Sequence, residues 1–490
     1  MFYAGSRTPH IVSPTYSTWI VLLLLLAASA CGSDNGGPTP VAALPTDAQN
    51  AEGEYISWQE NLIDDQYNSG GVPLRGGDGL QMADLDNDGL LDIVSAHEDS
   101  DHLRVAYASE DGPHDWFRLS LAEGPEVDAV EDVALGDVNG DGFADIITAC
   151  ERGHLIYLQN PANKIQGWRW DRVIPTVTRN RGSFIRVFLA DLDGDGSLEV
   201  VASNKGSGAN EKGEKTTAIS WFDPPANPLD PDGWTEHVLT RVKVPINAQP
   251  VDLDGDGDLD VFAGSRGEER VFWFENQGSS EGGGLTFTEH PVDIDLGSHA
   301  SAEEIRITGF NLAFHDFNSD WRIDVVLSAP VRHSVGWIKQ PADPAQPWTF
   351  HMIGSIKPDH VTGITLTDIT GNGQPDLMVG GYSRGPRRED GPEATVNDPS
   401  GRITWFENPG SPGGAWKQHD VSRRKRGMFD AFIATDLDYD GDVDFVATRG
   451  NSNEFDGVFW LQQLHSEAPA NRFTPAREQE SEPLPLPKGL

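Results

Sequence analysis

The sequence is poor in cysteine, in basic residues and in long apolar runs. Its 490 residues contain two cysteines, Cys31 and Cys150, which excludes a framework of several disulfides. Lysine and arginine total 36 against 77 acidic residues, giving a formal net charge of −41. Such acidity argues against nucleic acid and anionic membrane surfaces as partners. The apolar run at residues 19–30 is too short to span a bilayer as a helix.

What the chain has in abundance is a repeated acidic motif. Its pattern is D-x-(D/N/T)-x-(D/N)-(G/W)-x-x-(D/E), and a β-branched apolar run follows each copy. The seven copies begin at Asp84, Asp137, Asp191, Asp252, Asp316, Asp368 and Asp436. The intervals between them are 53, 54, 61, 64, 52 and 68 residues, a range typical of arrays built from one supersecondary unit.

The motif has the chemistry of a Ca²⁺ loop. Oxygen ligands at positions 1, 3 and 5 converge in a tight turn, glycine at position 6 bends the chain, and the acid at position 9 closes the cage. An EF-hand is excluded because position 12 is never Glu and strands, not helices, follow. The candidate ligands are Asp84, Asp86, Asp88, Asp92, Asp137, Asn139, Asp141, Asp145, Asp191, Asp193, Asp195, Glu199, Asp252, Asp254, Asp256, Asp260, Asp316, Asn318, Asp320, Asp324, Asp368, Thr370, Asn372, Asp376, Asp436, Asp438, Asp440 and Asp444.

The alternative interpretation is that these residues form polar hairpin turns without metal. Seven copies in register favour Ca²⁺ over that alternative. The copies are not equivalent, because the fifth has Trp321 at the glycine position and the sixth has only two carboxylates. We expect both of these loops to bind Ca²⁺ weakly or not at all.

The segments around each loop predict an all-β fold, a seven-bladed β-propeller with four antiparallel strands per blade. Each unit has strands before and after the loop, a third strand with a recurrent aromatic residue, and a fourth that begins with an aromatic residue. The third-strand aromatics are interpreted as core. A fourth-strand pattern at residues 58–63 precedes the first loop, so we expect the N-terminal strand to close the ring. Residues 471–474 are a weaker competitor for that position.

These loops and phrases such as Ile-Thr-Trp-Phe-Glu-Asn resemble the FG-GAP/VCBS repeat family, over about residues 57–463. That family includes the integrin α-subunit head and many bacterial surface proteins. The resemblance implies a calcium-loop propeller. It does not specify an activity, because the family contains adhesion modules, lectins and some polysaccharide-active enzymes.

The N-terminus resembles a bacterial lipoprotein signal, since the apolar run ends in Ala28-Ser29-Ala30-Cys31. The resemblance implies lipidation of Cys31 in a bacterial cell envelope, and Gly32 after the cysteine implies the outer membrane. Cys150 would then have no disulfide partner, and we expect it to be buried. The expected organisation is a signal peptide (1–30), a flexible tether (31–53), the propeller (54–464) and a disordered tail (465–490).

Basic residues recur after the second strand of six units, at Arg152, Lys205, Arg266, Arg332, Arg384 and Arg449, with His97 in the first unit. The topology predicts a ring of cations on the face opposite the calcium loops, with more charge from residues 423–426. The alternative is that these cations pair with neighbouring acids. At the channel mouth we expect Asp78, Asp132, Arg186, Asn247, Asn311 and Asp430.

Two functions are compatible with this pattern. The favoured one is a monomeric, lipid-anchored, calcium-stabilised propeller that binds an anionic glycan or protein on its cationic face and does not bind nucleic acid. The alternative is a polysaccharide lyase or hydrolase acting on polymers that contain uronic acid, with a base drawn from His299, His315, His333 and His360. Binding is favoured because no His-Tyr-Arg set stands out in the sequence.

Overall fold

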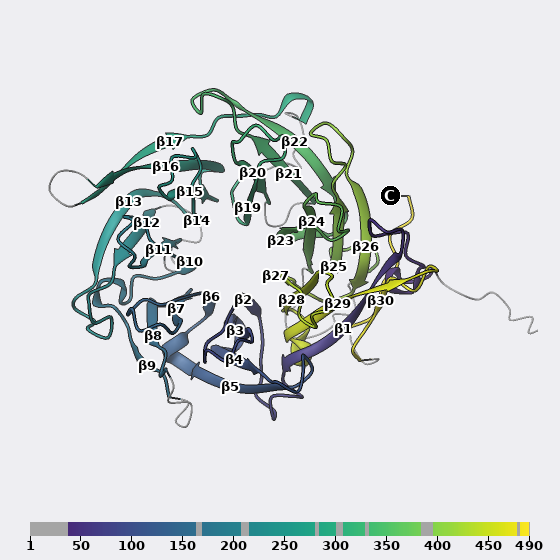
Figure 1. Cartoon of the computed structure of the whole chain (residues 1–490), viewed down its shortest axis with the longest axis horizontal. Helices are drawn as coiled ribbons and strands as arrows, with labels where there is room; N and C mark the ends of the chain where they lie inside the picture. Colours follow the sequence, from purple (N-terminus) through teal and green to yellow (C-terminus); the bar gives the residue numbers. More distant parts are fainter. Residues whose placement is uncertain are drawn as a thin grey trace, which may run out of the picture. The chain divides into compact units, whose positions relative to one another are not determined.

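The computed structural model describes residues 38–162, 169–206, 215–279, 284–299, 307–328, 333–383, 395–477 and 481–489. Contacts divide the chain into Met1–Pro38, almost wholly outside the described residues, and Thr39–Leu490. The second unit is a ring of seven β-sheets (Figure 1). No α-helix occurs among the described residues, so the all-β prediction is confirmed. No helix in this part of the chain is long and apolar enough to cross a membrane.

Six blades are built from strands in chain order, with the first strand innermost and the fourth outermost (Figure 1). They are β2 (Gly77–Ala83), β3 (Asp92–His97), β4 (His102–Ala108) and β5 (Trp116–Glu123); β6 (Val130–Gly136), β7 (Asp145–Cys150), β8 (Leu155–Gln159) and β9 (Asp171–Val173); β10 (Phe184–Ala190), β11 (Glu199–Asn204), β12 (Thr216–Asp223) and β13 (Thr235–Lys243); β14 (Pro245–Val251), β15 (Asp260–Ser265), β16 (Arg270–Ser279) and β17 (Leu285–Pro291); β19 (Leu312–His315), β20 (Asp324–Leu327), β21 (Ser334–Lys339) and β22 (Trp348–Ser355), with β18 (Ile294–Asp295) added outside β22; and β23 (His360–Thr367), β24 (Asp376–Tyr382), β25 (Gly401–Glu407) and β26 (Lys417–Arg424).

The seventh blade combines the two ends of the described chain. It contains β27 (Phe432–Thr435), β28 (Asp444–Arg449), β29 (Gly457–Ser466) and then β1 (Tyr55–Asp65), which pairs antiparallel with β29. Outside β1 lies β30 (Phe473–Thr474), paired in parallel with it. The N-terminal strand therefore takes the fourth position of this blade, and the C-terminal segment adds a fifth strand.

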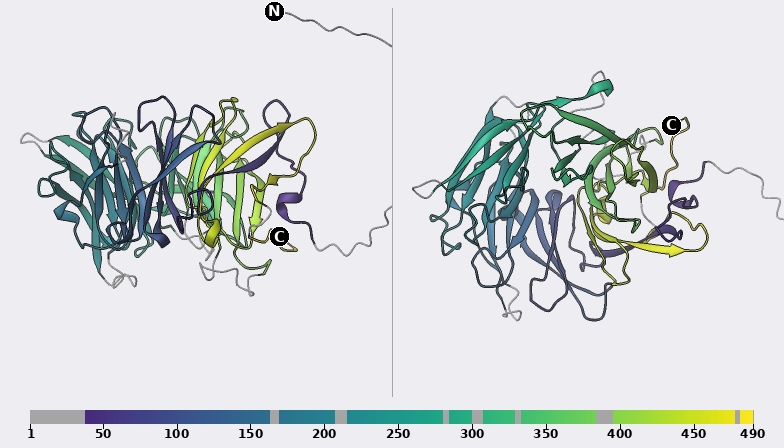
Figure 2. Two further views of the ribbon diagram at one scale, coloured as in Figure 1. Left: turned by 90° about the horizontal axis from the view of Figure 1, so that it is seen from below. Right: turned by 45° about the horizontal axis from the view of Figure 1, so that its top comes forward.

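The hydrophobic core lies between the blades. Seven apolar clusters among the described residues each join one blade to its neighbour, and one of them joins the seventh blade to the first through Trp460, Leu437 and Ile93. The second strands are covered on both faces, which explains why their sequences are continuous β-branched runs and not alternating ones. Seen edge-on, the strands run between the two faces of the ring, and the connecting loops lie at those faces (Figure 2).

The segments expected to be a flexible tether and a disordered tail are ordered where they are described. Val41 is fully buried and donates its N–H to Leu484 O over 3.0 Å, and Thr46 N donates to Ala470 O over 2.8 Å. Phe473 is also buried. Composition did not predict this order, because a few apolar side chains and backbone hydrogen bonds hold both segments against the outer edge of the propeller.

Candidate metal centres

All seven acidic loops connect the first and second strands of their blades and lie on one face of the ring. In each, the acid at position 1 organises the turn. In the first loop, Asp84 accepts N–H groups from Asp88 over 3.0 Å and from Gly89 over 2.9 Å. The same pair of contacts recurs in the second, fifth, sixth and seventh loops. The backbone is therefore already folded around the point where the ligands converge.

Position 6 has a positive φ in every loop. The six glycines there have φ between 83° and 100°, at Gly89, Gly142, Gly196, Gly257, Gly373 and Gly441. Trp321 takes the same left-handed conformation, with φ of 68°, and its N–H reaches Asp316 Oδ2 over 2.7 Å. The fifth loop thus keeps the shared turn in spite of the substitution.

The acid at position 9 fastens the loop to the blade. Asp92 accepts N–H groups from Leu85 in the loop over 2.9 Å and from Ala108 at the end of the third strand over 2.8 Å. Burial raises the pKa of Asp92 to about 7, in spite of these donors and with a further contribution from Asp86. The equivalent acids of the other loops also have a raised pKa, of about 6 or 7. A bound cation would favour their ionised form.

The loop oxygens fit a hard divalent cation. Three acidic side chains have oxygens within 4.8 Å of one another in the first, third, fourth and seventh loops. Among the described residues, four oxygens of candidate ligands are buried without a hydrogen-bond donor: Asp86 Oδ1, Asp191 Oδ1, Thr370 Oγ1 and Asp438 Oδ1. Asp442 Oδ1, in the seventh loop but outside the candidate ligand set, is a fifth such oxygen. Buried acceptors of this kind are costly unless a donor or a cation satisfies them, and oxygen-only sets suit Ca²⁺.

In the fifth loop, basic side chains of the same blade neutralise part of the acidic charge. Asp320, at position 5, forms an ion pair with Arg322, and Lys339 Nζ lies 3.7 Å from the same carboxylate. We therefore still expect this loop to bind metal weakly. The reason is that its acid at position 5 is already paired with cations, and not that Trp321 strains the backbone. The sixth loop offers two carboxylates together with Thr370 and Asn372. In the second loop, the Asn139 amide donates to Asp141 Oδ2 over 3.1 Å.

A second set of residues couples the loops to the seams between blades. Asn160, at the end of the third strand of blade two, donates through Nδ2 to Leu85 O in the loop of blade one over 2.8 Å and to Ala144 O over 2.9 Å. Asn276 makes the same contacts with Leu192 O and Leu259 O, and Gln340 Nε2 reaches Leu253 O. We did not predict this role from the sequence, although an Asn or Gln three residues after the third-strand aromatic of these blades was its signal.

The third-strand aromatics are buried, which confirms their interpretation as core: Tyr107, Tyr157, Trp221, Trp273, Trp337, Trp405 and Trp460. Tyr157 also donates its hydroxyl to Asp145 Oδ2 over 2.9 Å. Four of the tryptophans stack on a histidine of the fourth strand, and the closest ring centroids, those of Trp221 and His237, are 3.9 Å apart.

On the opposite face, the predicted cations occupy different environments. Arg152 pairs with Asp128 over 3.1 Å, Lys205 pairs with Glu151, and Arg266 is exposed. Arg449 is buried beside Glu60, with 3.3 Å between Nη1 and Oε1. Arg332 and Arg384 lie outside the described residues, as does Cys31. His97 is fully buried, with Nε2 3.0 Å from Ser95 Oγ.

The basic run at residues 423–426 was expected to add charge to the face opposite the calcium loops, but Arg423, Arg424 and Arg426 are buried, and the first two of them end β26. Arg423 is buried in a two-pronged contact with Asp359, over 2.8 and 2.9 Å. Arg424 reaches Glu60 over 2.9 Å. Burial alone would raise the pKa of Glu60, but Arg424 and Arg449 together hold that pKa below its usual value. Arg424 of blade six and Arg449 of blade seven therefore share Glu60 of β1, and the Arg424–Glu60 pair joins the two blades.

At the channel mouth, Arg186 extends from blade three across the axis. Its Nη2 donates to Asn311 Oδ1 of blade five and to Asp430 Oδ2 of blade seven, both over 3.1 Å. The predicted channel-mouth residues, Asp78, Asp132, Arg186, Asn247, Asn311 and Asp430, do line one cavity, of about 230 Å³.

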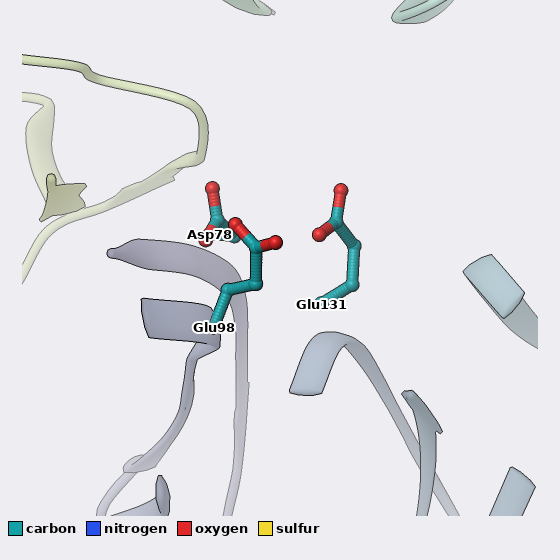
Figure 3. A group of neighbouring side chains, drawn as sticks. All are labelled: Asp78, Glu98 and Glu131. Carbon is teal, nitrogen blue, oxygen red and sulfur yellow. The ribbon is translucent and has the colours of Figure 1, made fainter. Parts of the chain in front are cut away.

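Beside that cavity, the carboxyl groups of Asp78, Glu98 and Glu131 face one another, with oxygens within 4.8 Å (Figure 3). Burial raises the pKa of Glu131 to about 8, and Glu98 adds to the increase. Sequence patterns did not reveal this group, because its members come from two blades and only Asp78 belongs to the predicted channel-mouth set.

Two of the four histidines considered as catalytic bases lie together. The rings of His333 and His360 are 4.9 Å apart, and His333 Nδ1 lies 2.7 Å from Asp359 O. His299 and His315 pack edge-on against Phe350 and Phe317.

Comparison with known proteins supports the repeat. Residues 84–148 and 137–202 match the FG-GAP-like repeat model. No curated protein matches the chain. Among solved structures, two crystals of BBS1N in complex with ARL6DN, one soaked with mercury and the other with lead, share 11% sequence identity with it. The mercury-soaked structure has a TM-score of 0.44 and the lead-soaked one 0.43; each covers 84% of this chain, and the alignments span 97% and 98% of those chains.

Proposed function

We propose, from the premise that this chain is a seven-bladed β-propeller with FG-GAP-like repeats, that it is a calcium-stabilised binding module. The observation that carries the proposal is the set of buried loop oxygens without donors, held in turns that are already folded. Because the first, third and fourth loops are also bonded to the next blade, Ca²⁺ in these loops would stabilise the seams as well as the turns.

Thermal unfolding with Ca²⁺, with Mg²⁺ and with EGTA tests the calcium proposal. We expect a higher Tm in Ca²⁺ than in EGTA, and little effect of Mg²⁺, which prefers a rigid octahedral shell. An identical Tm in Ca²⁺ and EGTA would mean that the loops are ordinary polar turns.

For the ligand, we propose an anionic glycan or protein bound on the face opposite the loops. Arg152 and Arg266 support this, since both are exposed, and the Arg152–Asp128 pair has side-chain exposures of 60% and 40%. An exposed pair contributes only about 0–1 kcal/mol, so a ligand carboxylate or sulfate can replace Asp128. Arg332 and Arg384 belong to the same proposal. The buried Arg449 is assigned a structural role.

Titration with polygalacturonate and dextran sulfate at low salt tests this face. The Arg152→Ala/Arg266→Ala double variant should bind more weakly than the wild type, and salt should weaken binding of both. Arg169→Ala is the matched control, because Arg169 is equally a surface arginine, 86% exposed, but precedes β9 near the calcium-loop face. Equal binding by the wild type and the double variant would remove the proposed site.

We also propose that a lipid on Cys31 anchors the protein to the bacterial envelope, with the outer membrane as the expected location. The residues that support this are the short apolar run and the small residues before the cysteine. Cys31→Ser should move the protein from the membrane fraction to the soluble fraction without changing its Tm. Retention in the membrane pellet would contradict the proposal.

One observation favours the enzymatic alternative. His333 Nδ1 faces the carbonyl oxygen of Asp359 and therefore donates to it, which leaves the Nε2 lone pair available as a base. A lyase would release an unsaturated uronate with a new ultraviolet absorbance. We expect no such absorbance with polygalacturonate or alginate. If the wild type produces one and His333→Ala does not, the protein is a lyase and the binding proposal is wrong.

A further inference from the structure

Trp321 is in a conformation that costs free energy. It occupies position 6 of the fifth loop with φ of 68°, whereas the other six loops have glycine there. A left-handed conformation costs a residue with a β-carbon about 1–2 kcal/mol, a cost that glycine avoids. The six sister loops show that this turn forms without a side chain, so the turn itself does not require tryptophan.

The indole is also placed in solvent. Trp321 is 94% exposed, whereas the tryptophans of the third strands are at most 8% exposed. Within the described residues, none of the aromatic or cation–π contacts involves its ring. Backbone strain thus coincides with an exposed aromatic ring at Trp321, and no ring contact within the described residues offsets the strain. Strained backbone of this kind clusters at functional sites.

The loop that carries Trp321 is held by internal contacts. Asp316 accepts the N–H groups of Asp320 and Trp321, over 3.1 and 2.7 Å. Asp320 pairs with Arg322 and lies 3.7 Å from Lys339 Nζ. This internal neutralisation distinguishes the fifth loop from the three-carboxylate loops, and these contacts hold the turn that carries the indole without a metal ion.

The acidic charge of the calcium-loop face limits the class of ligand that can bind beside Trp321. Carboxylates of all seven loops lie on the same face as the indole, so nucleic acids and anionic membranes are repelled. An uncharged sugar is not repelled, its hydroxyl groups can donate to the loop carboxylates, and the apolar face of a pyranose ring matches a flat indole. Tyr439, on the seventh loop of the same face, is 71% exposed and has φ of 60°.

We propose that Trp321 is the stacking platform of a binding site for an uncharged glycan on the calcium-loop face. The site is separate from the anionic-ligand face proposed above and depends neither on that face nor on Ca²⁺.

Trp321→Gly is the decisive variant, because it restores the residue of the six sister loops. Its Tm should equal or exceed that of the wild type, so loss of binding cannot be ascribed to unfolding. Affinity electrophoresis in gels containing galactomannan, xyloglucan or starch should show retardation of the wild type by at least one of them. Trp321→Gly should weaken that affinity about tenfold or more, since tenfold corresponds to 1.4 kcal/mol and burying an aromatic side chain contributes at least that much.

Phe117→Ala is the matched control, since Phe117 is an aromatic residue 51% exposed on the outer strand β5 of blade one and belongs to no calcium loop. It should bind as the wild type does, in Ca²⁺ and in EGTA. Equal retardation of the wild type and Trp321→Gly, or no retardation in any of the three gels, would overturn the proposal. If the wild type floats with phosphatidylcholine vesicles and Trp321→Gly does not, the indole binds a membrane instead. If the wild type dimerises and Trp321→Gly does not, the indole binds a second copy of the chain.

Discussion

At the scale of single residues, six of the seven acidic loops are held through their second residue, whose N–H reaches the acid at position 9. Leu192 donates its N–H to Glu199 over 2.8 Å, while its carbonyl accepts from Asn276 of the next blade over 2.8 Å. The Leu192 side chain is buried in the apolar cluster between those blades. One residue therefore connects the loop, the position-9 acid and the seam.

Asn276→Ala tests this connection. The substitution leaves the carbonyls of Leu192 and Leu259 without their donor, and a buried unsatisfied group costs about 1–3 kcal/mol. We expect a loss of unfolding free energy in that range, measured in urea. Asn372→Ala is the control, because Asn372 is an exposed asparagine in a loop. Equal losses of unfolding free energy in the two variants would mean that the hydrogen bonds of Asn276 contribute no more than a surface contact does.

Glu131 gives the protein a pH dependence of known sign. Burial raises its pKa to about 8, with Glu98 adding to the increase and Lys205 and Arg186 opposing it. The folded state therefore holds a proton that the unfolded state loses at lower pH, so stability falls as pH rises through about 8. Glu131→Gln should be as stable as the wild type at low pH and more stable above that pKa. Unfolding in EGTA across this range measures the difference, and parallel pH curves would contradict it.

At the scale of the element, the loops share one backbone but differ in charge. Asp440 and Asn372 both occupy position 5, and each donates its N–H to the position-1 acid over 3.0 Å. Each side chain also accepts a loop N–H, from Asp442 and Gln374 respectively. The two residues therefore play the same structural part, and only one brings a charge to the ligand set.

This pair separates metal binding from turn formation. Asp440→Ala should reduce the increase in Tm that Ca²⁺ produces, because one site bound at a hundredfold excess over its Kd is worth about 2.7 kcal/mol. Asn372→Ala should leave that increase nearly unchanged. Melting each variant in Ca²⁺ and in EGTA gives the comparison; similar losses in both would contradict the ranking of the two loops.

At the scale of the whole molecule, the two ends of the chain complete one blade. β1 pairs with β29, β30 lies outside β1, and Phe473 enters the core between blades six and seven. Arg424 lies over the Phe473 ring, with 4.9 Å from its Cζ to the centroid. The C-terminal segment thus contributes to the stability of the ring.

Phe473→Ala should therefore destabilise the propeller. Removing a buried phenylalanine costs about 3–5 kcal/mol, whereas the same change in a disordered tail would cost nothing. Thr474→Ala is the control, since Thr474 is the exposed neighbour in the same strand. Urea unfolding of both variants measures the effect, and indistinguishable midpoints would mean that the segment is not packed in solution.

The sequence by itself determined the number of blades, the strand order and the acidic loops, because each of these depends on residues within one repeat. Asp84 finds Asp88 and Gly89 within the same turn, so the motif alone specifies that geometry. The same local logic identified the third-strand aromatics as core. It also gave the correct conformation for position 6 in the six loops that have glycine.

Only the tertiary structure decided how the cations and the ends of the chain are used. Arg186 reaches Asp430 across 244 positions, and Arg449 meets Glu60 across 389. Whether a cation on a strand end is exposed, like Arg152, or buried in an ion pair, like Arg449, depends on which acid the closed ring brings beside it. Closure of the ring also placed apolar residues of the terminal segments against its outer edge. There the free energy gained by burying these residues outweighs the conformational entropy that the segments lose when they become ordered.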